Sequence, residues 1–293
     1  MRIDRPRVMA KARPGTLPLP VRQDVHAFTK PEIFERWSGI AAGVRGLAMG
    51  DNIITMFDVI GEDYWSGGGI TAKKVAAQLK AIGDRPVEVQ INSPGGDMFE
   101  GIAIFNVLRE HPKDITIKVM GMAASAASVI AMAGDRIEMG AASFLMIHNC
   151  WVLAIGNRHD MRETAEWLEP FDRAMVDVYA ARTGRSPADI AKWMDSETYM
   201  SGSQAIERGF ADTLLSSDEM TVDEQAQASD RDVNELRALE LHLVSAGMSL
   251  SKARARINKI KGAPDAALNG PAAQSAVEDD WSGLAGLIAT LRY

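Results

Sequence analysis

Short apolar segments alternate with segments of helical periodicity between residues 53 and 182, and this alternation limits the folds that the chain can adopt. Four apolar runs, at 53–60, 87–91, 115–119 and 144–147, have the length and composition of strands. Residues 72–82, 98–108 and 158–182 carry apolar side chains at helical spacing. Strands that alternate with helices form a largely parallel sheet covered by helices. The sequence therefore predicts an α/β fold.

Capping residues mark where the first two helices begin. Thr71 is a candidate N-cap for the helix over 72–82. Asp97 is placed to cap the next helix, with Glu100 in the reciprocal position of a capping box. After the long helix, we expect a closing strand around Phe210.

Two turns rich in glycine and small residues follow neighbouring strands. Ser93-Pro94-Gly95-Gly96 comes directly after one strand, and the segment from Gly121 to Ser125 follows the next. Parallel strands would bring both turns to one edge of the sheet. The Ser125 hydroxyl would then lie at a helix N-terminus, where free amides and the helix dipole favour negative charge. A nucleophilic serine and the oxyanion that it generates require such a place.

A serine hydroxyl needs a base, and imidazole has a suitable pKa for that work. Among five histidines, His148 alone ends an apolar strand inside the α/β region. A third group must orient the imidazole, and Asp195 and Glu197 are the available carboxylates. Taken singly, Ser125 is better explained as a small packing residue and His148 as a hydrogen-bonded core histidine than as catalytic groups. Their joint occurrence in a fixed order favours a catalytic site.

Composition excludes several classes of protein. The single cysteine, Cys150, cannot close an intramolecular disulfide, so a disulfide-stapled secreted scaffold is excluded. A net charge of −7 argues weakly against a general nucleic-acid binder, and no apolar run reaches the length of a membrane span. No HExxH motif, clustered Cys/His spacing or GxxxxGK[ST] loop predicts a metal or a nucleotide, so we expect neither metal nor cofactor. We expect no nucleic acid or membrane as a partner.

The order of the motifs resembles the Clp-type (ClpP-like) serine protease family. The resemblance covers residues 50–215, and its separated motifs in register make it specific. The segments that carry it are Ile91-Asn92-Ser93-Pro94-Gly95-Gly96, Gly121-Met122-Ala123-Ala124-Ser125, Met146-Ile147-His148, Thr183-Gly184, Met200-Ser201 and Gly209-Phe210-Ala211-Asp212. The resemblance implies a crotonase-like superhelix of repeated strand-strand-helix units, and a homo-oligomeric ring that cleaves protein or peptide substrates.

Carried over by position, the resemblance makes Ser125 the nucleophile and His148 the general base. Gly96 and Ala126 match the two amides of the oxyanion hole, while Ser128 matches no functional position and is interpreted as a helix residue. The family has Asp as third member, and alignment without a gap places Glu197 there. Asp195 is the alternative, which needs a local shift, and a Ser-His dyad helped by a backbone carbonyl is a third arrangement.

The two ends of the chain extend beyond the family's domain. Residues 1–30 hold seven Lys/Arg against two acids, a charge of 7 − 2 = +5, with four prolines. We predict a basic, flexible N-terminal arm over 1–48, a ClpP-like protease domain over 49–216, and a helical and linker tail over 217–293. The arm and the tail resemble those of the phage and prophage head-maturation branch, whose members cut scaffold or capsid proteins. That resemblance implies a cytoplasmic enzyme in a bacterium or a phage-infected host.

Other functions stay open from sequence. The enzyme would act without ATP or be fed by an ATPase unfoldase partner. A crotonase-like enzyme would use a similar oxyanion site on a coenzyme A thioester, without needing Ser125 and His148 together. A Ser-Lys protease like signal peptide peptidase shares the Ser-Pro-Gly-Gly turn but needs a lysine base. A catalytically inactive structural or scaffold subunit would keep the fold alone, and the glutamate at the third position keeps this alternative open.

Overall fold

The computed structural model describes residues 26–27, 29–40, 44–46, 50–216, 220–222 and 224–261. The chain divides into two compact units, residues 1–228 and 229–293. Most of the predicted N-terminal arm and the end of the predicted tail lie outside the described residues. The domain limits drawn from sequence, at 48/49 and 216/217, stay predictions.

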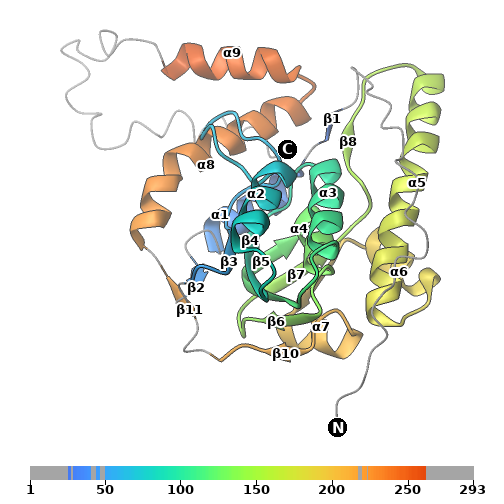
Figure 1. Ribbon diagram of the computed structural model, residues 1–293. Helices are drawn as coiled ribbons and strands as arrows, with labels where there is room; N and C mark the ends of the chain where they lie inside the picture. The colour runs from blue at the N-terminus through green and yellow to red at the C-terminus, as the bar shows by residue number, and fades with distance from the viewer. Residues whose placement is uncertain are drawn as a thin grey trace. The chain divides into compact units, whose positions relative to one another are not determined.

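A seven-stranded sheet forms the framework of the first unit (Figure 1). Five strands lie in the order β10-β6-β5-β4-β3, and each neighbouring pair is parallel. Their bounds are β3 Ile53–Met56, β4 Val87–Ser93, β5 Ile115–Ala124, β6 Arg136–Met139 and β10 Thr213–Leu214. The predicted α/β fold with a parallel sheet is confirmed, and β4 and β5 are neighbours as expected.

Strand β5 changes partner along its length, and this change creates the place for the site. Its first part, Thr116 to Val119, pairs with β6, whereas Met122 to Ala124 pair with β7 (Phe144–Ile147). Strand β9 (Thr198–Ser201) then pairs antiparallel with β7. The ends of β5 and β7 therefore lie next to each other, with β9 on the far side of β7.

Helices α2 (Ala72–Ile82) and α3 (Met98–Arg109) lie side by side in front of the sheet in Figure 1. Thr71 caps α2 by accepting a hydrogen bond from the Lys74 amide at 3.3 Å, as predicted. The predicted strand over 53–60 is shorter, because β3 ends at Met56 and Ile60 makes only isolated bridges.

The predicted capping box on α3 is only half correct. Asp97 caps α3 through bonds from the amides of Phe99 and Glu100, at 2.7 and 3.2 Å. The Glu100 carboxylate does not return to the Asp97 amide, but accepts from the Ala72 amide of α2 at 2.7 Å. The Asp97 amide is already donated to the Ile60 carbonyl at 2.8 Å. Because α2 and α3 pack together, one glutamate satisfies the open N-terminus of the neighbouring helix instead.

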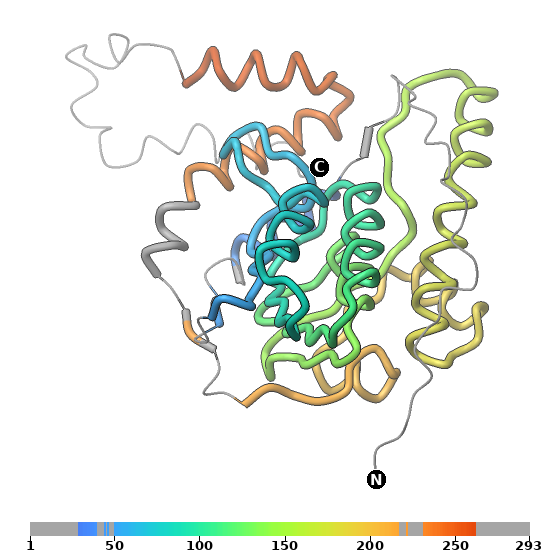
Figure 2. The backbone as a smooth tube through the Cα atoms, in the orientation of Figure 1, coloured from blue at the N-terminus to red at the C-terminus, as the bar shows by residue number. Residues whose placement is uncertain are grey.

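The remaining helices of this unit frame the sheet. They are α1 (Pro31–Ile40), α4 (Ala126–Ala131), α5 (Arg158–Thr183), α6 (Pro187–Asp195) and α7 (Gly202–Arg208). In Figure 2 the chain leaves β7 through β8 (Val152–Leu153), and α5 then returns in the opposite direction beside the sheet. Helix α1 is held to β4 by Trp37, whose indole NH donates to the side-chain and backbone oxygens of Asn92 at 3.1 and 3.3 Å.

Two short ribbons are formed by pieces far apart in the sequence. Strand β1 (His26–Ala27) pairs antiparallel with β8, and β2 (Val44–Gly46) pairs antiparallel with β11 (Met220–Val222).

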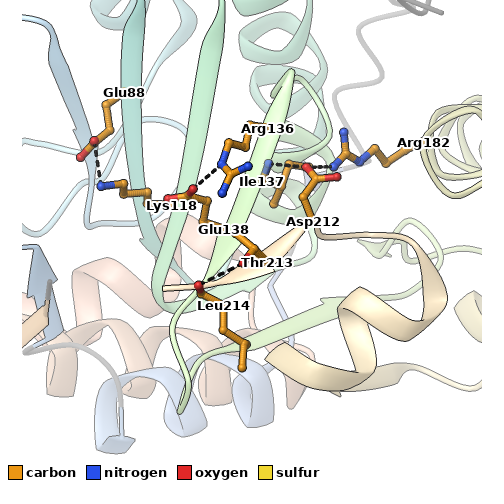
Figure 3. Close-up of polar contacts among 9 residues, drawn as sticks. All are labelled: Glu88, Lys118, Arg136, Ile137, Glu138, Arg182, Asp212, Thr213 and Leu214. Atoms are coloured by element: carbon orange, nitrogen blue, oxygen red, sulfur yellow. Dashed lines mark hydrogen bonds and ion pairs between the residues drawn. The ribbon is translucent and has the colours of Figure 1, made fainter. Parts of the chain in front are cut away.

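Asp212 joins three elements at the closing edge of the sheet (Figure 3). Its Oδ2 accepts from the Ile137 amide of β6 at 2.8 Å and from Arg182 of α5 at 2.5 Å. The closing strand β10 begins directly after Asp212, so the strand expected around Phe210 is displaced to Thr213–Leu214. Phe210 is instead fully buried in the core before the strand starts.

The second unit is described up to residue 261. It contains most of α8 (Glu224–Ser245) and all of α9 (Leu250–Lys261). Arg254 of α9 donates two hydrogen bonds to the Glu240 carboxylate of α8, at 2.9 and 3.2 Å, and so ties the two helices together. None of the helices within the described residues combines the length and the apolar character that crossing a bilayer requires.

Candidate functional site

Ser125 lies between the end of β5 and the first residue of α4. Its backbone has φ 53° and ψ −124°, a conformation that residues other than glycine rarely adopt. Such strain costs on the order of 1–3 kcal/mol and persists only where the surroundings fix it. The neighbours Ala124 and Ala126 are buried and small, so the chain can turn sharply from strand to helix here.

The register of β5 and β7 brings His148 to Ser125. Ala124 lies opposite Met146, and the Ser125 amide donates to the Met146 carbonyl at 3.0 Å. His148 follows two residues after Met146, and its Nε2 lies 2.7 Å from the Ser125 Oγ. The two residues that sequence analysis paired are thus in direct hydrogen-bond contact. This geometry allows Nε2 to take the hydroxyl proton.

Burial keeps the imidazole neutral. His148 is 5% exposed, and burial lowers its pKa from 6.5 to about 4. The Glu197 charge raises this pKa and the Lys30 charge lowers it, both less than burial does. The Nδ1 atom is buried and has no hydrogen-bond partner among the described residues. A neutral imidazole can accept a proton, and its Nδ1 is open to a third group.

Neither carboxylate expected as third member is bonded to His148 Nδ1. Asp195, the last residue of α6, accepts a hydrogen bond from the Asn149 amide group at 2.8 Å. Glu197 forms an ion pair with Lys30, whose ammonium also lies 4.7 Å from the centre of the Trp151 ring. Glu197 is close enough to His148 to act on it electrostatically.

The glycine turn after β4 lies directly against Ser125. A Cβ added to Gly95 would be 2.8 Å from the Ser125 Cβ and 3.1 Å from the Ala126 nitrogen. Gly95 has φ 90° and Gly96 has φ 149°, so both positions also favour glycine conformationally. The Ile60 amide donates to the Gly95 carbonyl at 2.8 Å and holds this turn in place.

Ala126 is the first residue of α4, so its amide has no acceptor within the helix. The expected oxyanion donors, Gly96 and Ala126, therefore belong to two backbone segments that meet beside Ser125. Their assignment as donors stays a prediction.

Two polar residues to which sequence analysis gave no role form hydrogen bonds at the turn that contains Ser125. Ser128 donates its hydroxyl to the Ser125 carbonyl at 2.6 Å, and its Oγ lies 2.7 Å from the Tyr179 hydroxyl of α5. Both residues are buried. Lys30 was likewise not identified as a site residue. A serine three residues after Ser125 was the only sequence signal for the first contact, and nothing in the sequence indicated Tyr179.

Cys150 is unsuited to replace Ser125 as a nucleophile. Burial raises the pKa of its thiol above the ordinary value, and the neighbouring Asp172 carboxylate raises it further. A protonated thiol is a poor nucleophile. Within the described residues, no three His, Cys, Asp or Glu side chains cluster in a way that would hold a metal ion.

Comparisons with known proteins point to one family. The family model described as Clp protease matches residues 68–218. The ATP-dependent Clp protease proteolytic subunit 3 of Rhodococcus jostii is 33% identical over 136 residues, 45% of this chain and 67% of the relative. Subunit 1 of the same protease from Prochlorococcus marinus is 30% identical over 151 residues, 50% of this chain and 77% of the relative. The ATP-dependent Clp protease proteolytic subunit of Deinococcus radiodurans is 28% identical over 150 residues, 49% of this chain and 74% of the relative.

Proposed function

The chain belongs to the Clp protease family, and from that premise we propose that it is a serine endopeptidase with Ser125 as nucleophile and His148 as general base. The contact of 2.7 Å between the Ser125 Oγ and the His148 Nε2 carries the proposal. A strained backbone at the nucleophile and a neutral imidazole beside it support the same assignment.

In the proposed reaction, the Ser125 oxygen forms a bond to the peptide carbonyl carbon while its proton passes to His148 Nε2. The carbonyl oxygen becomes an oxyanion, which the amides of Gly96 and Ala126 stabilise. Collapse of this intermediate breaks the C–N bond, and the leaving amine takes the proton from His148. Water then repeats the sequence on the acyl-enzyme, which releases the acid product and restores the hydroxyl.

We assign the third position to Glu197 rather than Asp195. Glu197 acts electrostatically on His148, whereas Asp195 is bonded to Asn149. Glu197 also has φ 46°, and it and Ser125 are the two residues other than glycine with positive φ in the described chain. Strained residues concentrate at functional sites. In this proposal Glu197 leaves Lys30 and accepts from His148 Nδ1 when the imidazole becomes charged.

The proposed substrate goes beyond membership of the family. We propose that the enzyme forms a homo-oligomeric ring and cleaves scaffold or capsid proteins during phage head maturation, either without ATP or fed by an ATPase unfoldase. The basic residues 1–30 and the tail over 217–293 support this branch, because both extend beyond residues 68–218, which match the family model. Cytoplasmic location follows from the same proposal.

A fluorophosphonate probe tests the catalytic assignment. The full chain should be labelled at Ser125, and Ser125→Ala should abolish both labelling and cleavage of a peptide library, by about 10³-fold or more. Ser143→Ala is a matched control, because Ser143 is a buried serine whose hydroxyl is bonded to the Gly140 carbonyl at 2.8 Å. Parental cleavage by Ser125→Ala would show that the nucleophile is wrong.

A second candidate function is an inactive structural subunit of the same fold. Among the described residues His148 Nδ1 has no hydrogen-bond partner, and Glu197 is ion-paired with Lys30. Both observations favour this candidate, because neither places a carboxylate on the imidazole. Absence of labelling in the assembled parent chain would support this candidate.

If the parent chain is labelled, a comparison of Glu197→Gln with Asp195→Asn assigns the third member, since only loss of the correct carboxylate should lower turnover.

A further inference from the structure

A buried chain of two hydroxyl groups connects α5 to the peptide bond that follows the nucleophile. Ser128 Oγ donates to the Ser125 carbonyl at 2.6 Å and lies 2.7 Å from the Tyr179 hydroxyl. Ser128 is 0% and Tyr179 1% exposed, so water does not compete for these bonds. Tyr179 lies 51 residues further along the chain, on a different helix.

Counting protons fixes the direction of the chain. A carbonyl oxygen only accepts, so the single Ser128 proton is used in the bond to Ser125. Ser128 Oγ must then accept from Tyr179, which donates its phenolic proton. Burial raises the pKa of Tyr179 above its ordinary value, so the phenol keeps this proton. The order is Tyr179 hydroxyl to Ser128 hydroxyl to Ser125 carbonyl.

The Ser125 carbonyl is held by further donors. The amides of Ser128 and Val129 donate to it at 2.9 and 3.3 Å. These two bonds belong to the first turn of α4, whereas the Ser128 hydroxyl adds a shorter bond that is itself fixed by Tyr179. Together they hold a residue whose φ of 53° is unfavourable for serine.

The direction of the Ser125 carbonyl determines the direction of the Ala126 amide. A trans peptide unit is planar, and its C=O and N–H point in opposite directions. The Ala126 nitrogen lies beside the glycine turn after β4, 3.1 Å from a Cβ added to Gly95. Rotation of the plane that joins Ser125 to Ala126 would therefore redirect the Ala126 N–H at this place. That N–H is one of the two proposed oxyanion donors, and such donors act only when they point at the developing charge.

We propose that Ser128 and Tyr179 are positioning residues that fix the Ser125–Ala126 peptide plane and so aim the Ala126 N–H at the oxyanion. The inference rests on the proposed function, because it concerns the same reaction. It assigns a role to Tyr179 on α5, and it makes the oxyanion site depend on a helix that contributes no catalytic residue.

Two single variants test the pair with little change in packing. Tyr179→Phe removes one hydroxyl and keeps the ring, which packs edge-on against Phe210 with centroids 5.7 Å apart. Ser128→Ala removes the middle hydroxyl. Ser143→Ala is the matched control, since Ser143 is also buried and also donates to the carbonyl three residues before it, at 2.8 Å, but that carbonyl belongs to Gly140 and not to Ser125.

Loss of a whole oxyanion donor costs about 10²- to 10³-fold in kcat, so a misdirected donor should cost about 10-fold. We expect each variant to lower kcat and the rate of fluorophosphonate labelling by about 10-fold, with KM within about twofold. The double variant should lose about as much as one single variant, because Tyr179 acts through Ser128. The acid midpoint of the pH profile should not move, because the base is untouched.

The outcomes separate this inference from the proposed function. A parent chain that is not labelled at Ser125 would overturn both. A labelled parent whose Tyr179→Phe and Ser128→Ala variants react within about twofold of Ser143→Ala would overturn the positioning role alone. Losses that multiply in the double variant, or that fall on KM, would also overturn it. Circular dichroism on each variant verifies that the measured protein is folded.

Discussion

The neutral, buried imidazole predicts an unusually acidic limit for activity. In the proposed mechanism only neutral His148 accepts the Ser125 proton, so kcat/KM and the labelling rate should follow the neutral fraction. With a pKa of about 4, about 90% of His148 is neutral at pH 5. At the ordinary value of 6.5, about 3% would be neutral. The structure therefore predicts a rate at pH 5 about 30-fold higher, relative to the plateau, than an unperturbed histidine allows.

The assay is the second-order rate of fluorophosphonate labelling at Ser125 between pH 4 and 8 at constant ionic strength. Unfolding must be excluded, because the same pKa links to stability. Between pH 6.5 and 4 the unfolded chain binds a proton at this histidine that the folded chain does not. Stability should therefore fall with decreasing pH in this window, by up to about 3 kcal/mol. Circular dichroism at each pH shows where the rate still describes folded protein.

Three variants test the direction in which neighbouring charges shift the midpoint of the pH profile. Glu197 raises the pKa of His148, so Glu197→Gln should move the midpoint to lower pH. Lys30 lowers that pKa, so Lys30→Met should move it to higher pH. Asp195→Asn is the control and should leave it in place, since Asp195 is bonded to Asn149. A parental midpoint at or above 6.5 would refute the reasoning, because burial would then not dominate at His148.

Two further changes probe the framework of the site. Gly95→Ala should abolish labelling and destabilise the chain by about 2 kcal/mol or more, because Gly95 has φ 90° and an added Cβ would lie 2.8 Å from the Ser125 Cβ. Gly83→Ala is the control: Gly83 has φ 71° but open space around it, so this variant should destabilise the chain less and keep labelling. Arg182→Met should lower the free energy of unfolding in urea by about 2 kcal/mol, because it breaks a largely buried ion pair with Asp212. An unchanged urea concentration at half-unfolding would show that this ion pair does not stabilise the edge of the sheet.

The parts of the fold that follow from periodicity could be predicted, and so could the meeting of distant turns. Alternating strands and helices imply parallel neighbours, and parallel neighbours place their carboxyl ends at one edge. That reasoning alone brings Ser125 into the region of the Gly95 turn, as the structure has it. The approach of His148 needed one more fact, the register of β5 against β7, which sequence order only made plausible.

The contacts that could not be predicted are those made by long or buried side chains between segments without a shared period. Glu100 has a local partner in the sequence, the Asp97 amide, yet it bonds to α2 because packing brings a second open amide within reach. Lys30 and Glu197 are 167 residues apart, and either could have been paired with many other charges. A helical pattern indicates which face of α5 is buried but not which buried residue meets a hydroxyl.

Backbone strain offers a criterion that the sequence does not contain. Alignment of the motifs without a gap places Glu197 in the third position, and a local shift of two residues would place Asp195 there instead. In the described chain, positive φ at residues other than glycine occurs at Ser125 and at Glu197, on either side of His148 in sequence and both coupled to it by contact or by charge. Serine and glutamate carry a Cβ that disfavours positive φ, so the surrounding structure must hold both conformations. At Glu197 the end of α6 supplies that support, because Glu197 follows the C-cap Ser196 and its amide donates to the Met194 carbonyl at 3.0 Å. Ser125 lies at the start of a helix and has no such helix end before it, so backbone strain marks Ser125 more specifically than Glu197.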